Sequence, residues 1–358
     1  MATLLAAHKQ WATRPPDERF QSLEDMHRQV LAYNAQSVER ADIPWSDLKV
    51  SSLDDDVVLI GSGGVPARLT NWSFGQLANL AGAPAAYLRE LPAWLAETNL
   101  NHGMAGRTGS DVTNLLLHTS DDADLTVRSI NSSRYSRIWN HEITERLIDM
   151  QDLGWEPAIP DIVSDDMSPS LYASDHDMFV FLRSRDLTVE EKGNNNAVYR
   201  GVIVENSEVG ASALKLTRFL YRKLCCNRII WDASRIVDLS IRHVGNVSQR
   251  VSEFTMTLRQ WAEESATDEN AVIARAQQTV IAATKEEVLD AVFGKRSVGL
   301  SRKTIESGYD AAVADQDGDP RTVWGLVNGL TRWSQTIPFA DKRTDLERSA
   351  GKILAMKF

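Results

Sequence analysis

Residues 178–204, MFVFLRSRDLTVEEKGNNNAVYRGVIV, indicate the fold most clearly. Two runs rich in apolar residues, Met178–Leu182 and Tyr199–Val204, flank a very polar segment around Glu190–Asn196. Short apolar runs bounded by Gly- and Asn-rich segments are typical of β-strands. This stretch therefore predicts two strands and a sheet in this part of the chain.

The neighbouring segments predict further strands and several helices. By their apolar spacing, strands are expected at 57–60, 65–70, 114–118, 125–130 and 236–243, and helices at 71–95, 142–150 and 211–224. Gly61–Gly64 predicts a hairpin turn, because it lacks the lysine of a phosphate-binding loop. We therefore predict an α+β core domain over residues 51–245, with a mixed, mostly antiparallel sheet and packed helices.

The two ends of the chain differ from this core in their patterns. Residues 1–50 predict an N-terminal helical segment, and residues 246–358 predict a helical C-terminal region. In the latter, Thr284–Glu287 has the pattern of a capping box, and Gly294 ends that helix. Apolar residues also recur at coiled-coil spacing at Val247, Val251, Phe254, Leu258 and Trp261. This seam predicts a homo-oligomer.

The composition is that of a globular protein with an acidic balance. Of 358 residues, 43% are hydrophobic, and 39 Lys and Arg face 49 Asp and Glu, for a net charge of −10. Such a charge disfavours indiscriminate coating of nucleic acid. The start of the sequence has no basic region followed by a long apolar run, and the adjacent Cys225 and Cys226 form no disulfide framework, so we expect a cytoplasmic protein without membrane partners.

Charge is strongly segregated along the chain. Residues 213–250 hold eight basic and two acidic side chains, a net charge of +6, so the other 320 residues carry −16. On the expected helix, Lys215, Arg218 and Arg222 form one basic stripe, with Lys223 beside it. The stripe predicts a site for an anion, with nucleic-acid phosphate favoured. The alternative is a solvated helix face paired with nearby acids.

A second segment interleaves aromatic and basic residues. It contains Arg128, Arg134, Tyr135, Arg137 and Trp139. Bases stack on aromatic rings while cations contact phosphates in single-stranded nucleic-acid sites, so this segment is a second candidate. The alternative is that Tyr135 and Trp139, four residues apart, belong to the core.

Metal and catalytic patterns are weaker. Asp175-His176-Asp177 offers ligand-type side chains but fits an exposed turn better. Asp161, Glu190 and Lys192 resemble the carboxylates and lysine of a magnesium-dependent nuclease, although Glu190 and Lys192 precede a Gly-Asn-Asn-Asn segment rather than lying in a core strand. No serine or cysteine nucleophile motif is present. We predict neither a metal nor a cofactor, assign no catalytic residue, and place an enzyme second to a binding protein.

Three segments resemble a known family. They are Trp11–Phe20 (WATRPPDERF), Gly201–Trp231 (GVIVENSEVGASALKLTRFLYRKLCCNRIIW) and Thr322–Thr336 (TVWGLVNGLTRWSQT), with Ser133-Arg134-Tyr135 and Asn140 as a weaker fourth match. The chain thereby resembles the phage- and plasmid-like family catalogued as domain of unknown function 932. The most specific motif is the box Asn206-Ser207-Glu208-Val209-Gly210. Relatives often carry Cys-x-Asn-Gly where this chain has Cys226-Asn227-Arg228, which puts a turn there in doubt.

The resemblance implies a mobile-element context without assigning catalytic residues. Our first hypothesis is a DNA-binding protein, preferring single strands, that acts in strand annealing or as a recombination accessory factor. Asn206 and Glu208 have an equally weighted structural alternative, capping of the next helix. The other hypotheses are the magnesium-dependent nuclease and a non-enzymatic oligomeric module that uses the Val247–Trp261 seam.

Overall fold

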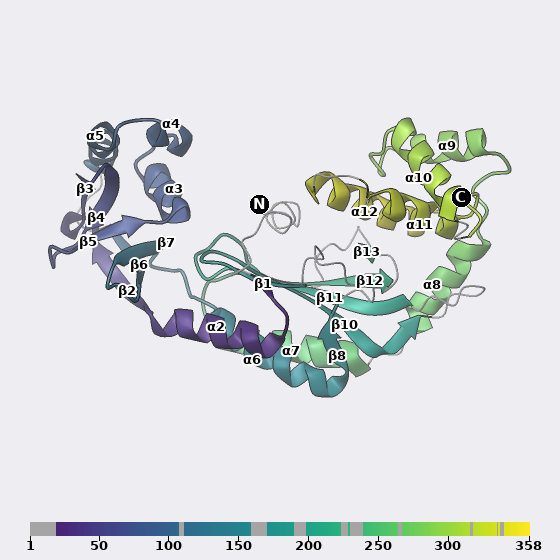
Figure 1. The fold of residues 1–358 in the computed structure, drawn as a ribbon, viewed down its shortest axis with the longest axis horizontal. Coiled ribbons are helices and arrows are strands. Elements are labelled where there is room, and N and C mark those ends of the chain that lie inside the picture. Colours follow the sequence, from purple (N-terminus) through teal and green to yellow (C-terminus); the bar gives the residue numbers. More distant parts are fainter. Residues whose placement is uncertain are drawn as a thin grey trace.

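The computed structural model describes residues 19–106, 111–158, 170–189, 198–222, 228–229, 239–263, 267–315, 318–334, 336 and 340–358. It contains an eight-stranded sheet, a six-stranded sheet and helices that pack against both. Figure 1 shows a curved molecule with the six-stranded sheet at one end, the eight-stranded sheet in the middle and the C-terminal helices at the other end. The predicted α+β class with mostly antiparallel sheets is confirmed.

The eight-stranded sheet is built around the two strands predicted from residues 178–204. They are β10 (Met178–Val189) and β11 (Val198–Asn206), which pair antiparallel with Val180 opposite Val204. The other strands are β1 (Arg19–Phe20), β8 (Trp155–Pro157), β9 (Leu171–Ala173), β12 (Leu214–Arg222), β13 (Arg228–Ile229) and β14 (Leu239–Ile241). Their order is β1-β9-β10-β11-β12-β13, with β8 also on β10 and β14 on β12.

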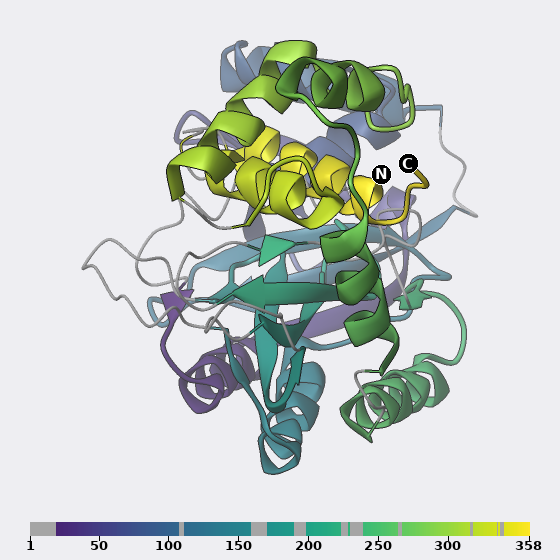
Figure 2. The same ribbon diagram turned by 90° about the vertical axis from the view of Figure 1, so that its right-hand side faces the viewer.

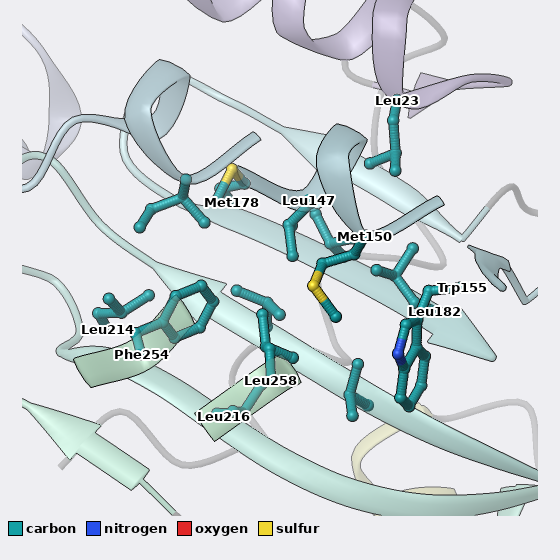
Figure 3. Packing of buried hydrophobic residues seen from close by; sticks show 14 of the residues in the cluster. Leu23, Leu147, Met150, Trp155, Met178, Leu182, Leu214, Leu216, Phe254 and Leu258 are labelled. Atoms are coloured by element: carbon teal, nitrogen blue, oxygen red, sulfur yellow. The ribbon is translucent and has the colours of Figure 1, made fainter. Parts of the chain in front are cut away.

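One face of this sheet packs against three helices. They are α2 (Leu23–Ala35), α6 (Asn140–Asp149) and α7 (Val247–Glu263). Figure 3 shows Leu23, Leu147 and Phe254 from these helices against Met178 and Leu216 of the sheet, and all five side chains are buried. Alternate residues of a strand share a face, and Met178, Val180 and Leu182 of β10 enter this core.

The coiled-coil-like seam of α7 lies inside this core. Val251, Phe254, Leu258 and Trp261 are all buried in it, and Val247 is partly buried against it. The spacing correctly predicted an amphipathic helix. Its apolar stripe, however, covers the chain's own sheet, so the seam is not an exposed surface for oligomers.

The six-stranded sheet carries its own helices. Its strands, in spatial order, are β2 (Ser37–Pro44), β6 (Val112–Thr119), β7 (Leu125–Ser132), β5 (Pro66–Leu69), β4 (Asp56–Ile60) and β3 (Lys49–Leu53), and the pair β5–β7 is parallel. The helices are α3 (Asn71–Leu80), α4 (Ala85–Arg89) and α5 (Ala93–Met104). The predicted turn at Gly61–Gly64 is confirmed, since it connects the antiparallel strands β4 and β5.

Every element described beyond α7 is a helix. The elements are α8 (Thr267–Gln278), α9 (Lys285–Phe293), α10 (Arg302–Asp315), α11 (Val323–Ser334) and α12 (Ala340–Leu354). The capping box of Thr284 and Glu287 and the end of α9 at Gly294 are confirmed. Figures 1 and 2 place α11 and α12 on the side of the eight-stranded sheet opposite to α2 and α6.

Two helix predictions are wrong. The segment 211–224 contains strand β12, which pairs with β11 and β14. Within residues 1–50, α2 is helical as predicted, but residues 37–44 form β2 and Lys49 begins β3. Among the described residues, no helix has both the length and the apolar composition that crossing a membrane requires.

Candidate functional site

The box Asn206–Gly210 lies where β11 ends, between the two sheets. Asn206 and Ser207 are fully buried and Glu208 is 3% exposed, although all three side chains are polar. Buried polar groups are stable only when they are hydrogen-bonded. The partners of these side chains therefore reveal what the box does.

Glu208 binds one group from each of two other elements. Its Oε2 accepts a hydrogen bond from Arg128 Nη2 of β7 at 2.9 Å, and its Oε1 accepts one from the backbone N–H of Asn140 at 2.8 Å. Asn140 is the first residue of α6, whose preceding residue makes no side-chain cap. Glu208 thus neutralises a buried arginine and takes the place of a cap at the start of α6.

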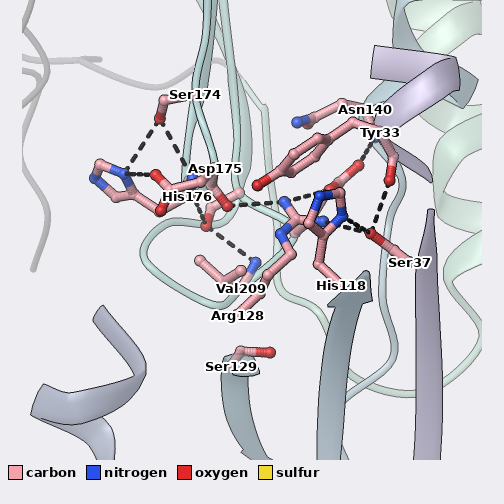
Figure 4. Close-up of polar contacts among 12 residues, drawn as sticks. Tyr33, Ser37, His118, Arg128, Ser129, Asn140, Ser174, Asp175, His176 and Val209 are labelled. Atoms are coloured by element: carbon pink, nitrogen blue, oxygen red, sulfur yellow. Dashed lines mark hydrogen bonds and ion pairs between the residues drawn. The ribbon is translucent and has the colours of Figure 1, made fainter. Parts of the chain in front are cut away.

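Arg128 also contacts other segments that lie between the two sheets. It donates to the backbone oxygen of Asp175 at 2.7 Å and to Ser37 Oγ at 3.2 Å, and its guanidinium lies 4.4 Å from the ring centre of Tyr33. Figure 4 shows Arg128 among these groups. One buried side chain of β7 therefore connects α2, β2 and the β9–β10 turn.

Val209 takes part in these contacts through its backbone. The carbonyl oxygen of Val209 accepts hydrogen bonds from Trp72 Nε1, Gln76 Nε2 and Asn131 Nδ2, at 3.1, 3.3 and 3.2 Å. Gly210 follows with φ +88°, a conformation in which a side chain is strained. The box therefore joins the eight-stranded sheet to α3 and β7.

Asn206 connects the same strand to the approach of α6. Its Nδ2 donates to the carbonyl of Ile138 at 3.0 Å and to Asn140 Oδ1 at 2.8 Å. Ser207 Oγ donates to the carbonyl of His176 at 2.6 Å, in the β9–β10 turn. The alternative of a cap on the next helix is corrected, since a strand follows the box and Glu208 caps α6 instead.

Tyr135 and His243 form a stacked pair beside the box. Their rings lie 5.2 Å apart with 9° between their planes, and Tyr135 Oη lies 3.0 Å from His243 Nδ1. Tyr135 Oη also contacts the carbonyls of Ser207 and Glu208, and the Glu208 carbonyl accepts from Arg137 as well. The tyrosine hydroxyl can donate to a carbonyl while His243 Nδ1–H donates to it.

Burial keeps both rings of this pair neutral. It raises the pKa of Tyr135 well above its ordinary value, although Arg137 opposes the shift. It also lowers the pKa of His243 from the ordinary 6.5 to about 4, and the charge of Arg137 adds to this effect. His243 Nε2 is buried without a hydrogen-bond partner, which fits an uncharged ring.

We call the cluster of Arg128, Tyr135, Arg137, His243 and the box 206–210 the junction. Arg128 pairs with Glu208, and Arg137 pairs with Glu39 at 3.0 Å, so its buried arginine charges are compensated. The side chains of both arginines are 1% exposed. The chemistry of the junction is therefore that of a polar joint between two sheets.

The basic stripe predicted on a helix does not form. Neighbouring residues of a strand point to opposite faces, so Lys215 and Arg218 of β12 lie on different sides of the sheet. Lys215 Nζ pairs with Glu205 at 2.8 Å, which opposes the rise in the pKa of Glu205 that burial causes. Arg218 lies 4.2 Å from the ring centre of Trp261. The Arg222 side chain and Lys223 lie outside the described residues.

The two basic segments nevertheless meet at the junction. Tyr135 and Val244 form an antiparallel bridge, and Ser136 N donates to the carbonyl of His243 at 2.9 Å. Arg134 and Arg242, which flank these contacts in the sequence, are both exposed. Among the described residues, neither has an ionic partner. We call Arg134 and Arg242 the exposed arginine pair.

The remaining predicted residues of the aromatic segment are less accessible. Arg137 is buried, and Trp139 is half-buried with the Arg137 guanidinium 5.4 Å from its ring centre. The same guanidinium lies 5.2 Å from the ring centre of Tyr135, whose ring also stacks on His243. Tyr135 is thus a structural residue of the junction in this conformation, in line with the core alternative.

Among the described residues, the fold brings no further ligand-type side chain to the candidate metal sites. Asp175-His176-Asp177 forms the β9–β10 turn, and the His176 ring lies between the two carboxylates at 3.2 and 3.4 Å. Within the described ranges, no group of three His, Cys, Asp or Glu side chains could hold a metal ion. Asp161, Glu190 and Lys192 of the nuclease pattern lie outside those ranges.

Sequence reasoning missed His243 of the junction and several residues that contact the junction. Trp72, Gln76, Asn131 and His243 have no motif that marks them, and each contacts a residue far away in the chain. The one available signal was the density of polar residues in the box itself. Polar side chains at the end of an apolar strand predict buried partners without identifying them.

Comparison with protein-family models finds a match that includes the whole junction. Residues 128–350 match the model described as "Domain of unknown function (DUF932)". The chain belongs to this family. The match covers more than half of the sequence and includes both arginines of the exposed pair and the box, so the predicted resemblance is confirmed. Neither the curated proteins nor the solved structures give a significant match.

Proposed function

We propose that this member of the DUF932 family binds nucleic acid, with single-stranded DNA favoured, as a non-catalytic protein of annealing or recombination. The observation that carries the proposal is the exposed arginine pair. Arg134 and Arg242 come from the two basic segments identified in the sequence, and the Tyr135–Val244 bridge holds these segments together. Each guanidinium can bind a phosphate of a strand that crosses both segments.

The ion pairs of other basic residues support the choice of Arg134 and Arg242 as the phosphate-binding residues. Lys215, Arg128 and Arg137 each have a carboxylate partner within the chain, so binding a phosphate there would break an existing ion pair. Arg134 and Arg242 can bind an anion without that cost. The net charge of −10 then limits phosphate contact to a small region of the surface.

Base stacking has a narrower role in the proposal than phosphate contact. The Tyr135 ring stacks on His243 at 5.2 Å, whereas half-buried Trp139 has its stacking partner His141 at 6.4 Å, so Trp139 is the less enclosed of the two rings for a base. Stacking on aromatic rings is sequence-tolerant and needs an unpaired strand. The proposal therefore favours single strands and weak sequence preference.

Fluorescence anisotropy with a labelled oligothymidine strand and a labelled duplex, measured over a salt series, tests the proposal. Each phosphate contact adds roughly 0.7 to the slope of log affinity against log salt for single strands. The double variant Arg134→Ala, Arg242→Ala should therefore lower the slope by roughly 1.4 and weaken binding at low salt. The control Arg28→Ala, Arg296→Ala removes two exposed arginines elsewhere and should change little.

Two results would refute the proposal. Wild-type affinity and salt slope in the Arg134→Ala, Arg242→Ala variant would exclude this surface. Equal weakening in the control variant would show that net charge alone sets the affinity. Adding magnesium also tests the nuclease alternative, because cleavage of the labelled strand would favour an enzyme.

A further inference from the structure

The six-stranded sheet must curl strongly, because its two edges are joined by a short connection. β2 and β3 are at opposite edges, and only residues 45–48 connect them. In a flat sheet, six strands would put the edges about 24 Å apart. Four residues and their flanking bonds reach at most about 17 Å even when extended, and three of them form a 3₁₀ turn. The sheet therefore bends around a hollow.

This hollow has the size and the floor of a ligand site. Its volume is about 660 Å³, and it is lined by residues from five strands of the sheet. Its apolar lining consists of Leu59, Ala67, Leu115, Leu117, Leu125 and Val127, of which Leu117 and Leu125 are partly exposed and the other four are buried in the core of this sheet. Leu59 pairs with Ala67 and Leu117 pairs with Val127 across neighbouring strands, so these side chains share the inner face. Small-molecule sites have mostly apolar walls and about this volume.

The rim of the hollow is acidic. Glu39, Asp42 and Asp47 line it together with one cation, Arg40. Glu39 already pairs with Arg137, but no described cation pairs with Asp42 or Asp47. Asp42 has φ +53°, and its backbone N–H donates to Asn114 Oδ1 at 3.0 Å, which fixes this bulged part of β2. Two unpaired carboxylates thus lie at the opening of an apolar hollow.

We propose that the hollow binds a small amphipathic ligand with an apolar body and one cationic group, such as an alkylamine. The apolar body packs between Leu117 and Leu125, and the cation lies at Asp42 and Asp47. Asp42 and Asp47 are exposed carboxylates that attract a cation, whereas an anionic ligand would be repelled by them. This site is distinct from the exposed arginine pair and does not depend on nucleic-acid binding.

Displacement of a fluorescent probe tests both parts of the proposal. The neutral dye N-phenyl-1-naphthylamine should brighten on entering the hollow, and decylamine and decanoate, used below their micelle concentrations, should compete with it. The two competitors share a chain of the same length and differ in charge. Decylamine should displace the dye at a concentration roughly tenfold lower than decanoate, which corresponds to about 1.4 kcal/mol.

Variants distinguish the contribution of the two carboxylates from that of the apolar hollow. In Asp42→Asn, Asp47→Asn, the preference for decylamine should fall to roughly twofold, whereas the control Asp122→Asn, Asp124→Asn in the exposed β6–β7 turn should keep the full preference. In Ala67→Phe, the new ring fills the hollow and dye binding should be lost, with unchanged circular dichroism showing that the chain folds.

The proposal is overturned if decanoate competes as well as decylamine in the wild type. It is also overturned if the Asp42→Asn, Asp47→Asn variant keeps the preference, or if neither decylamine nor decanoate displaces the dye. Should Ala67→Phe fail to fold, the comparison of the two aspartate pairs decides alone.

Discussion

Replacing Glu208 by Gln tests whether the junction holds the two sheets together. The carboxylate uses one oxygen for Arg128 and the other for the backbone N–H of Asn140. An amide has the same shape but offers one acceptor oxygen and no charge. The substitution therefore leaves a 1% exposed arginine without its counter-ion and one buried donor without an acceptor.

The expected cost follows from these two losses. Removing one partner of a buried ion pair costs roughly 3–5 kcal/mol, because the other charge stays buried. The backbone donor at the start of α6 belongs to the same network, so its loss is partly contained in that range. We expect the free energy of unfolding to fall by about 4 kcal/mol, a large part of the 5–15 kcal/mol that is typical of folded domains.

Urea unfolding followed by tryptophan fluorescence measures this change, provided that the slope with urea is unchanged. The matched control is Asp56→Asn, which breaks the ion pair with Arg68. Both of these side chains are about half exposed, so water replaces either partner and the cost should be about 1 kcal/mol or less. The reasoning fails if Glu208→Gln costs less than about 1 kcal/mol, or if the two variants are equally destabilised.

Three further predictions concern other parts of the structure. The pKa of His243 is lowered from 6.5 to about 4 in the folded chain, so as the pH falls the unfolded chain takes up a proton before the folded chain does. About 3 kcal/mol of stability should therefore be lost between pH 6.5 and 4. His243→Phe should remove that part of the pH dependence of unfolding. Gly329→Ala would overlap the backbone oxygen of Gly308 where α10 and α11 meet, and should lower the melting temperature, whereas Gly63→Ala meets no atom and should not. Leu258→Ala should lower the free energy of unfolding by roughly 2–5 kcal/mol and leave the molar mass measured by light scattering unchanged. A lower molar mass with unchanged stability would instead show that the seam forms an oligomer interface.

Local patterns in the sequence were sufficient for much of the fold. The capping box at Thr284, the turn after β4 and the strand pair β10–β11 each depend on neighbouring residues, and all three are confirmed. The seam of α7 was correctly predicted as an apolar stripe, since the same spacing serves a coiled coil and a helix on a sheet. Periodicity indicates that a face is buried and leaves open what covers it.

The wrong helix at 211–224 has a physical cause. Strands are recognised by alternation when one face is apolar and the other polar. In β12, Leu214 and Leu216 enter the core below the sheet, while Phe219 enters a second apolar cluster on the other face. Burial on both faces removes the alternation, and the spacing of the basic residues then resembles a helix. The predicted stripe failed for the same reason.

The sequence predicted which segments form the candidate site, but not which residues contact one another there. The box and both basic segments were found from composition and motif. Their partners lie far away in the sequence: Trp72 is 137 residues from Val209, and Arg128 is 80 residues from Glu208. Pairing over such distances is set by the packing of the two sheets, which no local pattern encodes.

Substitutions in the box and in the exposed arginine pair should affect stability and ligand binding differently, so the role of the box can be tested. The polar atoms of the box that have partners bind them inside the chain, so a substitution there acts on the joint first and on any ligand through the joint. The exposed arginine pair makes no ion pair among the described residues, so its loss should leave the free energy of unfolding unchanged. Binding that is lost in both kinds of variant, with stability lost in the Glu208→Gln variant alone, would mean that the box orients Arg134 and Arg242 for their ligand. The box would then support a binding surface without touching what it binds.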